Sequence, residues 1–359
     1  MRLLGSGPVA SVKPFRAVRY DESKAGPLAS LVAPPYDVLS PEQRAEYLAR
    51  SPRNVVHLTL PEDEQEAARL WRDWQAEGVL ARDSEPALWW LEQEYVGPDG
   101  VARKRDGLVA ALRAEPYSAR VVLPHERTHA GPKEGRLRLL RALRALVEPI
   151  FLLYDGSLDP PGGEPLLDVE LTGVRNRLWR VEGEAPAELA EAQLLIADGH
   201  HRYETTLAFH EEDGTEESAW LLAVIVPTHQ EGLTIFATHR LADGVELDGA
   251  EPAEEPPLEL LGRGTGPVVY RDGRTYLVPP RADLDAATVE PLVRGSVRYT
   301  PSAEEAIAAV DRGDAGAALL VRPPMVEQVR AVAERGETMP QKSTYFYPKL
   351  PSGLLFLPL

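Results

Sequence analysis

The longest uninterrupted apolar stretch of the chain, AWLLAVIVP at residues 219–227, is the feature that most constrains the fold. A membrane-spanning helix needs about 18 or more consecutive apolar residues, and this stretch is much shorter. We therefore expect a buried strand there, and no membrane partner. Strand-like and helix-like stretches alternate along the rest of the chain, so we expect an α+β protein with mixed sheets.

The length of 359 residues suffices for two or three domains. We expect an N-terminal α/β region at residues 1–105, a central catalytic unit at residues 106–242, and a C-terminal α/β region at residues 243–359. We also expect the tail of the last region, residues 337–359, to pack back near the site.

The chain has a net charge of −17 and no cysteine. Nucleic-acid binding relies on Lys and Arg to neutralise phosphates, so this charge favours a small-molecule substrate over a nucleic-acid partner. The lack of cysteine excludes disulfides, thiol catalysis and cysteine-ligated metal. The N-terminal MRLLGSGPVASVKPF lacks the apolar core of a signal peptide, so we expect a cytoplasmic protein. The sequence does not predict the oligomeric state.

The string HERTH, which begins at His125, matches the H-E-x-x-H signature of zinc proteases. In that signature His125 and His129 bind one zinc ion from one face of a helix, and Glu126 polarises the bound water. Pro124 precedes the string and Gly131-Pro132 follows it, which predicts a helix of under two turns. Such a helix is too short for a rigid site, so a zinc metallopeptidase is the weaker alternative.

Basic residues follow the same string. Arg127, Lys133 and Arg136 stand next to the two histidines and a Gly-Pro turn. In an acidic chain this local reversal of charge predicts an anion site. The alternative is a solvated polar loop and helix face.

A second cluster lies in LLIADGHHRYETTLAFH, where an apolar strand ends in Asp198-Gly199 and a helix follows. Backbone N–H groups at a helix N-terminus carry partial positive charge and attract anions. Together with Gly199, the side chains of His200, His201 and Arg202 predict a phosphate cradle. Asp198 would cap the helix or bind a hydrated cation such as Mg²⁺. The alternative is a capped helix with partly buried histidines.

Three further blocks carry candidate substrate-binding residues. Tyr36 and Asp37 end the rigid turn PPYD, and they either face the site or only set the direction of the chain. The loop after the last predicted helix would bind a phosphate or a carboxylate, or would simply lead into a strand. The candidate residues of that loop are Lys342, Ser343 and Thr344. Arg240 ends a strand and fits either the binding role or the structural one.

Five blocks occur in order: LVAPPYDVLSPEQ, PHERT with PKEGRL, ADGHHRYET, THR and MPQKSTYFYPKL. Together they resemble the bacterial and archaeal family called domain of unknown function 1015, over nearly the whole chain from Pro14. The family name implies no established activity.

The pair PHE and DGHHR is also similar to the ParB/sulfiredoxin-like fold, and most to its free-serine kinases. This resemblance implies a ParB-like central unit in which Glu126, beside His125, is the catalytic carboxylate and residues 198–202 hold nucleotide phosphates. Asp198 is also a candidate catalytic residue. About 70 residues separate the two motifs here, and the terminal regions are large. These departures leave the identity of the substrate open.

Phosphoryl transfer needs a phosphate clamp and a carboxylate that accepts or orients the attacking hydroxyl. We therefore expect a kinase that uses ATP or ADP with Mg²⁺ and acts on a small hydroxylated metabolite, free serine being the first candidate. The alternative is a nucleotide-binding regulatory protein of ParB-like type without kinase activity.

Overall fold

The structure, a computed structural model, describes residues 10–126, 128 and 130–359. Backbone contacts divide the chain into two compact units. Unit 1 combines the described parts of Met1–Pro124, Thr128–Leu233 and Pro348–Leu359, and unit 2 those of His125–Arg127 and Thr234–Tyr347. Each unit contains helices and at least one large sheet, so the expected α+β class is confirmed.

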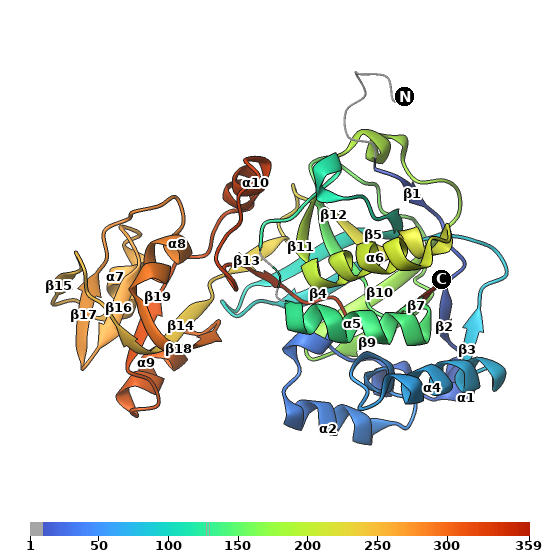
Figure 1. Ribbon diagram of the computed structural model, residues 1–359, viewed down its shortest axis with the longest axis horizontal. Helices are drawn as coiled ribbons and strands as arrows, with labels where there is room; N and C mark the ends of the chain where they lie inside the picture. Colours follow the sequence, from blue (N-terminus) through green and yellow to red (C-terminus); the bar gives the residue numbers. More distant parts are fainter. Residues whose placement is uncertain (1–9, 127, 129) are drawn as a thin grey trace. The chain divides into compact units, whose positions relative to one another are not determined.

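A nine-stranded mixed sheet forms the centre of unit 1 (Figure 1). Its strand order is β6-β11-β8-β12-β5-β4-β10-β9, and β1 also pairs with β5. β11 is parallel to β6 and β12 is parallel to β8, whereas the remaining pairs are antiparallel. The strands are β1 (Val12–Lys13), β4 (Leu88–Val96), β5 (Ala102–Arg113), β6 (Val122–Leu123), β8 (Ile150–Tyr154), β9 (Leu167–Leu171), β10 (Val174–Val181), β11 (Leu194–Asp198) and β12 (Trp220–Pro227).

The apolar stretch at residues 219–227 lies in the interior of this sheet. It forms β12, which pairs with β8 on one side and β5 on the other, and every residue of β12 is buried. The expected buried strand is therefore confirmed. Over the described part of the chain, none of the helices combines the length and apolar character that crossing a membrane requires.

Two long helices, α5 (Ala130–Leu143) and α6 (His200–Asp213), lie side by side against the sheet of unit 1 (Figure 1). Tyr203 of α6 joins a buried core with strand residues such as Ile150 and Ile196. Leu140 of α5 packs against Phe209 of α6. This packing fixes the N-terminus of α6 at the end of β11, because the helix begins two residues after Asp198.

Shorter elements complete unit 1. α2 begins as expected, with Ser40 as its N-cap, Pro41 in the first turn, and reciprocal hydrogen bonds between Ser40 and Gln43. The strands form two small pairs, β2 (Val18–Tyr20) with β3 (Leu80–Arg82) and β7 (Ala145–Leu146) with β21 (Leu357–Pro358). The helices are α1 (Glu22–Ala25), α2 (Pro41–Arg50), α3 (Val56–Thr59) and α4 (Glu64–Ala76), with short 3₁₀ turns η1 (Leu28–Ser30), η2 (Tyr36–Val38), η3 (Tyr117–Ala119), η4 (Ala187–Glu191) and η5 (Glu217–Ala219).

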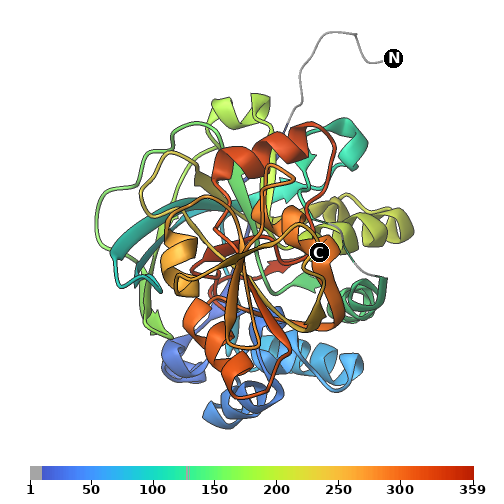
Figure 2. The ribbon, with the colours of Figure 1, turned by 90° about the vertical axis from the view of Figure 1, so that its left-hand side faces the viewer.

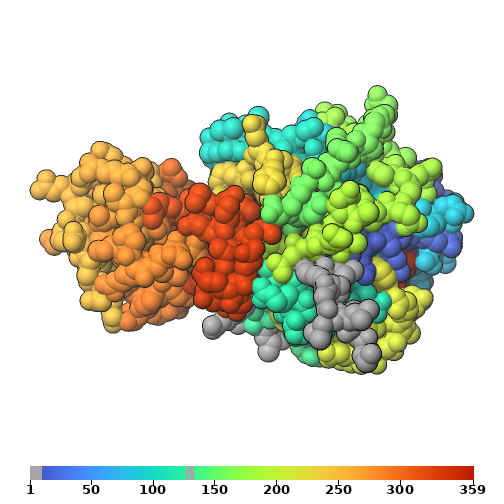
Figure 3. Space-filling view, turned by 90° about the horizontal axis from the view of Figure 1, so that it is seen from above, coloured from blue at the N-terminus to red at the C-terminus, as the bar shows by residue number. Residues whose placement is uncertain are grey.

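Unit 2 is built on a six-stranded antiparallel sheet with the order β15-β17-β16-β19-β14-β18 (Figure 2). Successive residues of a strand point to opposite faces, and here both faces are buried. Leu241 packs in a core with helix α9, and the next residue, Ala242, packs in a second core with Val289 of helix α8. In the space-filling view the strands and helices of this sheet, coloured amber to orange, form one continuous body (Figure 3).

The elements of unit 2 are β13 (Thr234–Phe236), β14 (His239–Val245), β15 (Glu251–Ala253), α7 (Pro257–Gly262), β16 (Val268–Arg271), β17 (Arg274–Leu277), α8 (Asp285–Val289), η6 (Glu290–Leu292), β18 (Val293–Thr300), α9 (Ala303–Asp311), β19 (Ala317–Leu320), α10 (Val326–Glu334) and β20 (Tyr345–Tyr347). β13 and β20 form a separate antiparallel pair.

The division into units differs from the domains expected from the sequence. The expected boundary after residue 105 falls inside β5, which pairs with β4 and β12 in the centre of the sheet, so residues 10–105 share one unit with residues 106–124. The boundary after residue 242 falls inside β14. The tail at residues 337–359 is divided, since residues 337–347 belong to unit 2 and residues 348–359 to unit 1.

Candidate functional site

The junction between β11 and α6 in unit 1 has the geometry of an anion-binding turn. Gly199 adopts a left-handed conformation with φ of 101°, and a Cβ atom at this position would lie 2.8 Å from Cγ2 of Ile150. α6 begins at His200, and its N-cap residue Gly199 supplies no side-chain hydrogen bond to the helix. The positive end of a 14-residue helix therefore follows a residue that only glycine fits well.

Asp198, directly before this turn, is held by two cations. Arg202 Nη2 lies 2.6 Å from Asp198 Oδ2, and the ammonium of Lys349 donates to Asp198 Oδ1. Burial alone would raise the pKa of Asp198, but Lys349 and Arg202 outweigh it and hold this pKa well below its usual range. The charge of the buried His200 acts in the same direction. Asp198 is thus ionised and structurally engaged.

Arg202 and Lys349 are charged for the same reason. Burial lowers the pKa of each group, and the carboxylate of Asp198 reverses this effect, so both pKa values lie above their ordinary ones. The guanidinium of Arg202 also donates to Pro149 O. The exposed Asp37 adds to the raised pKa of both cations, and Tyr36 adds to that of Arg202. The turn PPYD therefore lies near this cluster.

Lys349 follows Pro348, whose carbonyl is bound by an arginine of the central sheet. Arg105 of β5 is buried and donates through Nη2 to Pro348 O at 2.7 Å. Its guanidinium also stacks on the ring of Phe151, 4.4 Å from the centroid. Burial lowers the pKa of Arg105 to about 10, while the charge of Asp198 opposes this shift. Sequence reasoning missed both Lys349 and Arg105, although Lys349 stands in the block MPQKSTYFYPKL.

Arg136 and Glu148 form a second polar centre in unit 1. Glu148 accepts hydrogen bonds from the backbone N–H of Tyr36 at 2.9 Å, from Ser352 Oγ at 3.1 Å and from Arg136 Nη1 at 3.3 Å. Arg136 lies over the ring of Tyr36, 4.1 Å from the centroid, and donates to Thr59 O at 2.6 Å. Burial raises the pKa of Tyr36 to about 12. Glu148 thus joins α5, the PPYD turn and the C-terminal tail.

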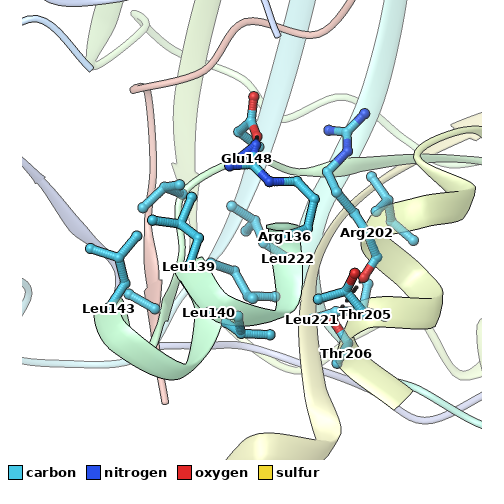
Figure 4. A pocket seen from close by; sticks show the side chains of 14 residues that line it. Arg136, Leu139, Leu140, Leu143, Glu148, Arg202, Thr205, Thr206, Leu221 and Leu222 are labelled. Atoms are coloured by element: carbon cyan, nitrogen blue, oxygen red, sulfur yellow. Dashed lines mark hydrogen bonds and ion pairs between the residues drawn. The ribbon is translucent and has the colours of Figure 1, made fainter. Parts of the chain in front are cut away.

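A narrow pocket of about 50 Å³ opens between α5 and α6. Arg136, Glu148 and Arg202 lie at one end of it, and leucine side chains such as Leu139 and Leu143 fill the other (Figure 4). This volume is too small for a nucleotide, so we place the candidate anion site at the turn before α6 rather than in the pocket.

The predicted anion site of Arg127, Lys133 and Arg136 is not one cluster in the structure. Lys133 Nζ lies 3.1 Å from Glu204 Oε2, which also accepts from Thr128 Oγ1 at 2.8 Å. Arg136 instead meets Glu148, because α5 points the two side chains to different carboxylates. Arg127 lies outside the described residues. The positive charges of Lys133 and Arg136 are therefore each balanced by a neighbouring glutamate.

Glu126 and His125 belong to unit 2, where they pair with the loop after α10. Glu126 Oε1 accepts a hydrogen bond from the backbone N–H of Lys342 at 3.1 Å. Lys342 adopts φ of 54°, an unusual conformation for a residue with a side chain. His125 is fully buried, and its Nε2 lies 3.0 Å from Thr344 Oγ1. Ser343 is engaged with its own loop, since its Oγ donates to Pro340 O at 2.6 Å.

Arg240, the remaining candidate, is buried in β14 of unit 2. Its Nη1 donates to Thr238 O at 2.6 Å, and its guanidinium lies 5.8 Å from the ring centroid of Tyr299. The neighbouring His239 accepts a hydrogen bond from the backbone N–H of Val321 through Nδ1 at 3.2 Å. Burial lowers the pKa of His239 to about 4. Unit 2 therefore gathers Arg240 with the loop residues Lys342, Ser343 and Thr344, as well as His125 and Glu126.

The string HERTH does not form the expected zinc-protease helix. Glu126 forms a strand bridge with Met339, and neither His125 nor Thr128 is helical. We predicted that Gly131-Pro132 ends a helix, but α5 begins at Ala130 and holds both residues in its first turn. Proline fits there because a first-turn N–H has no partner within the helix. His129 lies outside the described residues.

Asp198 was also predicted to bind Mg²⁺. Each of its two oxygens is bound by a partly buried cation, so a metal ion there would have to displace Arg202 or Lys349. Among residues 10–126, 128 and 130–359, no group of three or more His, Asp or Glu side chains is arranged to hold a metal ion. These residues do not fit a protein-bound Mg²⁺ at Asp198.

A family model described as "Protein of unknown function (DUF1015)" matches residues 12–256. No curated protein matches the chain. The fold is similar to a free serine kinase in complex with AMP, with 18% identity, a TM-score of 0.40, and coverage of 65% of this chain and 89% of that chain.

Two further solved structures are similar at the same level. A conserved hypothetical protein from Pyrococcus furiosus has 17% identity, a TM-score of 0.40, and coverage of 65% of this chain and 90% of that one. SbnI with a C-terminal truncation, from Staphylococcus aureus, has 14% identity, a TM-score of 0.41, and coverage of 67% and 84%. Likenesses of this strength carry no argument about function.

Proposed function

The chain belongs to the family described as "Protein of unknown function (DUF1015)", and we propose that it is a nucleotide-dependent phosphotransferase. Its substrate in this proposal is a small hydroxylated metabolite, with free L-serine as the first candidate and ATP or ADP as the phosphate donor. The observation that carries the proposal is the turn from β11 into α6, where Gly199 precedes a helix N-terminus without a side-chain cap.

This turn suits phosphate for two reasons. The partial positive charge of the α6 N-terminus attracts an anion, and a glycine in the left-handed conformation lets the backbone approach it closely. The buried Arg105 and the partly buried Arg202 and Lys349 lie near Asp198, while the carboxylates of Asp37 and Glu148 also act on Arg202. The proposed attraction for phosphate therefore rests on the N-terminus of α6 and on the glycine turn before it.

In this proposal Glu126 accepts the proton of the substrate hydroxyl. The hydroxyl oxygen forms a bond to the terminal phosphorus of the nucleotide, the bond from that phosphorus to its bridging oxygen breaks, and the shortened nucleotide leaves. The hydrogen bond from the Lys342 N–H keeps the Glu126 carboxylate oriented. His200 and His201, in the first turn of α6, hold the phosphates.

Because Asp198 is already occupied by two cations, we assign it a positioning role and expect any Mg²⁺ to arrive with the nucleotide phosphates.

The test is a direct assay of the full-length protein. Binding of AMP, ADP and ATP is measured by calorimetry, and phosphate transfer from ADP and ATP to L-serine and other hydroxylated metabolites is followed by mass spectrometry. We expect Glu126→Gln to lower kcat by about 100-fold or more while nucleotide binding is retained. Glu134→Gln on the exposed side of α5 is the matched control. A protein that binds no nucleotide contradicts the proposal, whereas binding without any transfer supports the regulatory alternative.

A further inference from the structure

One buried arginine of unit 2 has a hydrogen-bonding edge that lacks a protein partner within the described residues. Arg240 lies in β14, in register with Tyr299 of β18 and Leu319 of β19, and its side chain is 0% exposed. A guanidinium stays protonated under all ordinary conditions and offers five N–H donors. A fully buried guanidinium therefore needs acceptors around it.

The nitrogen atoms of Arg240 are used unequally. Nη1 donates to Thr238 O, whereas Nε and Nη2 are buried without a hydrogen-bond acceptor in the part of the chain that the structure describes. The N–H bonds of Nε and Nη2 point the same way from one edge of the planar group. This edge binds the two oxygens of a carboxylate side by side. The bond from Nη1 to Thr238 O keeps the edge fixed in place.

The charged groups near Arg240 compensate its buried positive charge only in part. Burial lowers the pKa of Arg240, and Glu290, Tyr299 and Glu126 oppose that shift only in part. Neither Glu290 nor Glu126 reaches hydrogen-bonding distance of Nε or Nη2. A buried charge without such a partner destabilises the protein, and an oxyanion on this edge would remove that effect.

We infer that the Nε–Nη2 edge of Arg240 is the subsite for the carboxylate of the substrate. This inference rests on the phosphotransferase function proposed above and narrows its substrate to hydroxy acids and hydroxy amino acids. Glu126 belongs to the same unit and its charge acts on Arg240. A carboxylate held on Arg240 therefore brings a hydroxyl one or two carbons away, as in glycolate or L-serine, into the neighbourhood of the proposed base.

Entry of the carboxylate requires side chains around Arg240 to move. The half-buried Tyr299, whose ring lies near the guanidinium, is the side chain that we expect to swing aside. When only an opened fraction of the protein binds, the observed affinity is lower than that of the open form by this fraction. Tyr299→Ala is thus expected to strengthen carboxylate binding.

The test measures binding to the full chain without nucleotide, so it does not depend on catalysis. Calorimetry measures the affinities of L-serine and L-serinamide, and those of glycolate and glycolamide. The affinity of inorganic phosphate is measured for comparison with all four compounds. We expect the carboxylates to bind at least 10-fold more tightly than their amides, and Arg240→Met to remove this difference. Arg240→Lys keeps the charge but loses the bidentate edge, so we expect intermediate affinity. Arg298→Met, an exposed arginine of β18, is the matched control.

The outcomes separate this inference from the proposed function. Equal binding of acids and amides by the wild type overturns the carboxylate subsite, and so does tighter binding of inorganic phosphate. If Arg240→Met and Arg240→Lys both lower Tm without ligand and keep the preference for acids, Arg240 is structural and the inference fails. If the preference depends on Arg240 but no phosphate transfer occurs, the subsite stands and the proposed function fails. Transfer with an unchanged KM for L-serine in Arg240→Lys overturns the subsite alone.

Discussion

Lys349 and Asp198 are 151 positions apart in the sequence, yet the ammonium of Lys349 donates to a carboxylate oxygen of Asp198 inside unit 1. Arg202, which is four residues after Asp198 in the sequence, binds the other carboxylate oxygen. This pair ties the C-terminal segment to the turn that begins α6. The order of the proposed phosphate site therefore depends on a residue near the end of the chain.

Lys349→Met is expected to destabilise unit 1 by about 2 kcal/mol, because it leaves a partly buried carboxylate with one cation instead of two. Chemical denaturation followed by tryptophan fluorescence measures this free energy of unfolding. All six tryptophans of the chain belong to unit 1, so the signal reports on that unit.

Lys104→Met is the matched control for this substitution. Lys104 Nζ lies 3.0 Å from Glu92 Oε2, but its side chain is 52% exposed. An exposed ion pair contributes about 1 kcal/mol or less, so this variant is expected to change stability only slightly. Similar losses for Lys349→Met and Lys104→Met would show that the partly buried pair between Lys349 and Asp198 stabilises the protein no more than an exposed pair.

The low pKa of Asp198 makes unit 1 sensitive to acid. In the unfolded chain the carboxyl of Asp198 takes up its proton near pH 3.9. In the folded protein burial would raise the pKa of Asp198, but Lys349 and Arg202 outweigh burial and hold this pKa below its usual range. The resulting stabilisation is complete above about pH 4 and is lost as the pH falls toward the pKa of the folded state. We expect the free energy of unfolding to drop between about pH 4 and pH 2, measured by urea denaturation.

Asp198→Asn tests the origin of this acid sensitivity. The variant lacks the titrating group, so its stability is expected to be lower at neutral pH and to change less in acid than that of the wild type. A slope with pH equal to that of the wild type would assign the acid sensitivity to other carboxylates.

The parts of the fold that depend on neighbouring residues were predictable. The buried strand β12, the capped start of α2 and the glycine turn before α6 all follow from short segments, because their chemistry is local. Tyr36 and Asp37 end the PPYD turn, for which the sequence left two roles open, and the charges of both residues act on Arg202.

The pairings between distant segments were not predictable. Nothing near Lys349 in the sequence indicates a partner at Asp198, and nothing near Arg105 indicates that it supports the tail. The boundary expected after residue 105 falls inside β5 for the same reason, because the pairing of β5 with β4 and β12 is decided by the whole sheet. Lys133 and Arg136 were grouped by proximity in sequence, whereas the helix directs them to Glu204 and Glu148.

Gly199→Ala is expected to destabilise unit 1 by about 3 kcal/mol and to weaken nucleotide binding. The φ of 101° strains any residue with a Cβ atom, and that atom would lie 2.8 Å from Ile150 Cγ2. Relief of this contact would shift the start of α6, which is the proposed phosphate site. Tryptophan fluorescence measures the stability, and calorimetry measures the binding of ADP.

Gly183→Ala separates the backbone strain from the contact. Gly183 has φ of 107°, but a Cβ atom there meets no other atom within 4 Å. This variant is expected to lose about 1 kcal/mol from backbone strain alone and to keep its affinity for ADP. Equal losses in the two variants would show that the contact with Ile150 does not matter.

His239 makes unit 2 sensitive to pH in a different range. Burial lowers the pKa of His239 in the folded protein to about 4, with Arg240 acting in the same direction and Glu304 opposing. The unfolded histidine binds its proton near pH 6.5, before the folded one does. The stability of unit 2 is therefore full above about pH 6.5 and falls as the pH decreases to about 4, by about 3 kcal/mol in total.

The hydrogen bond from the Val321 N–H to His239 Nδ1 gives this prediction a local readout. Protonation of Nδ1 removes the acceptor, so hydrogen exchange at Val321, corrected for the intrinsic effect of pH, should accelerate as the pH falls toward 4. In His239→Asn, the side-chain oxygen keeps an acceptor near the position of Nδ1 and does not titrate. We expect this variant to lose the pH dependence of Val321 exchange. Retention of that dependence would assign it to a group other than His239.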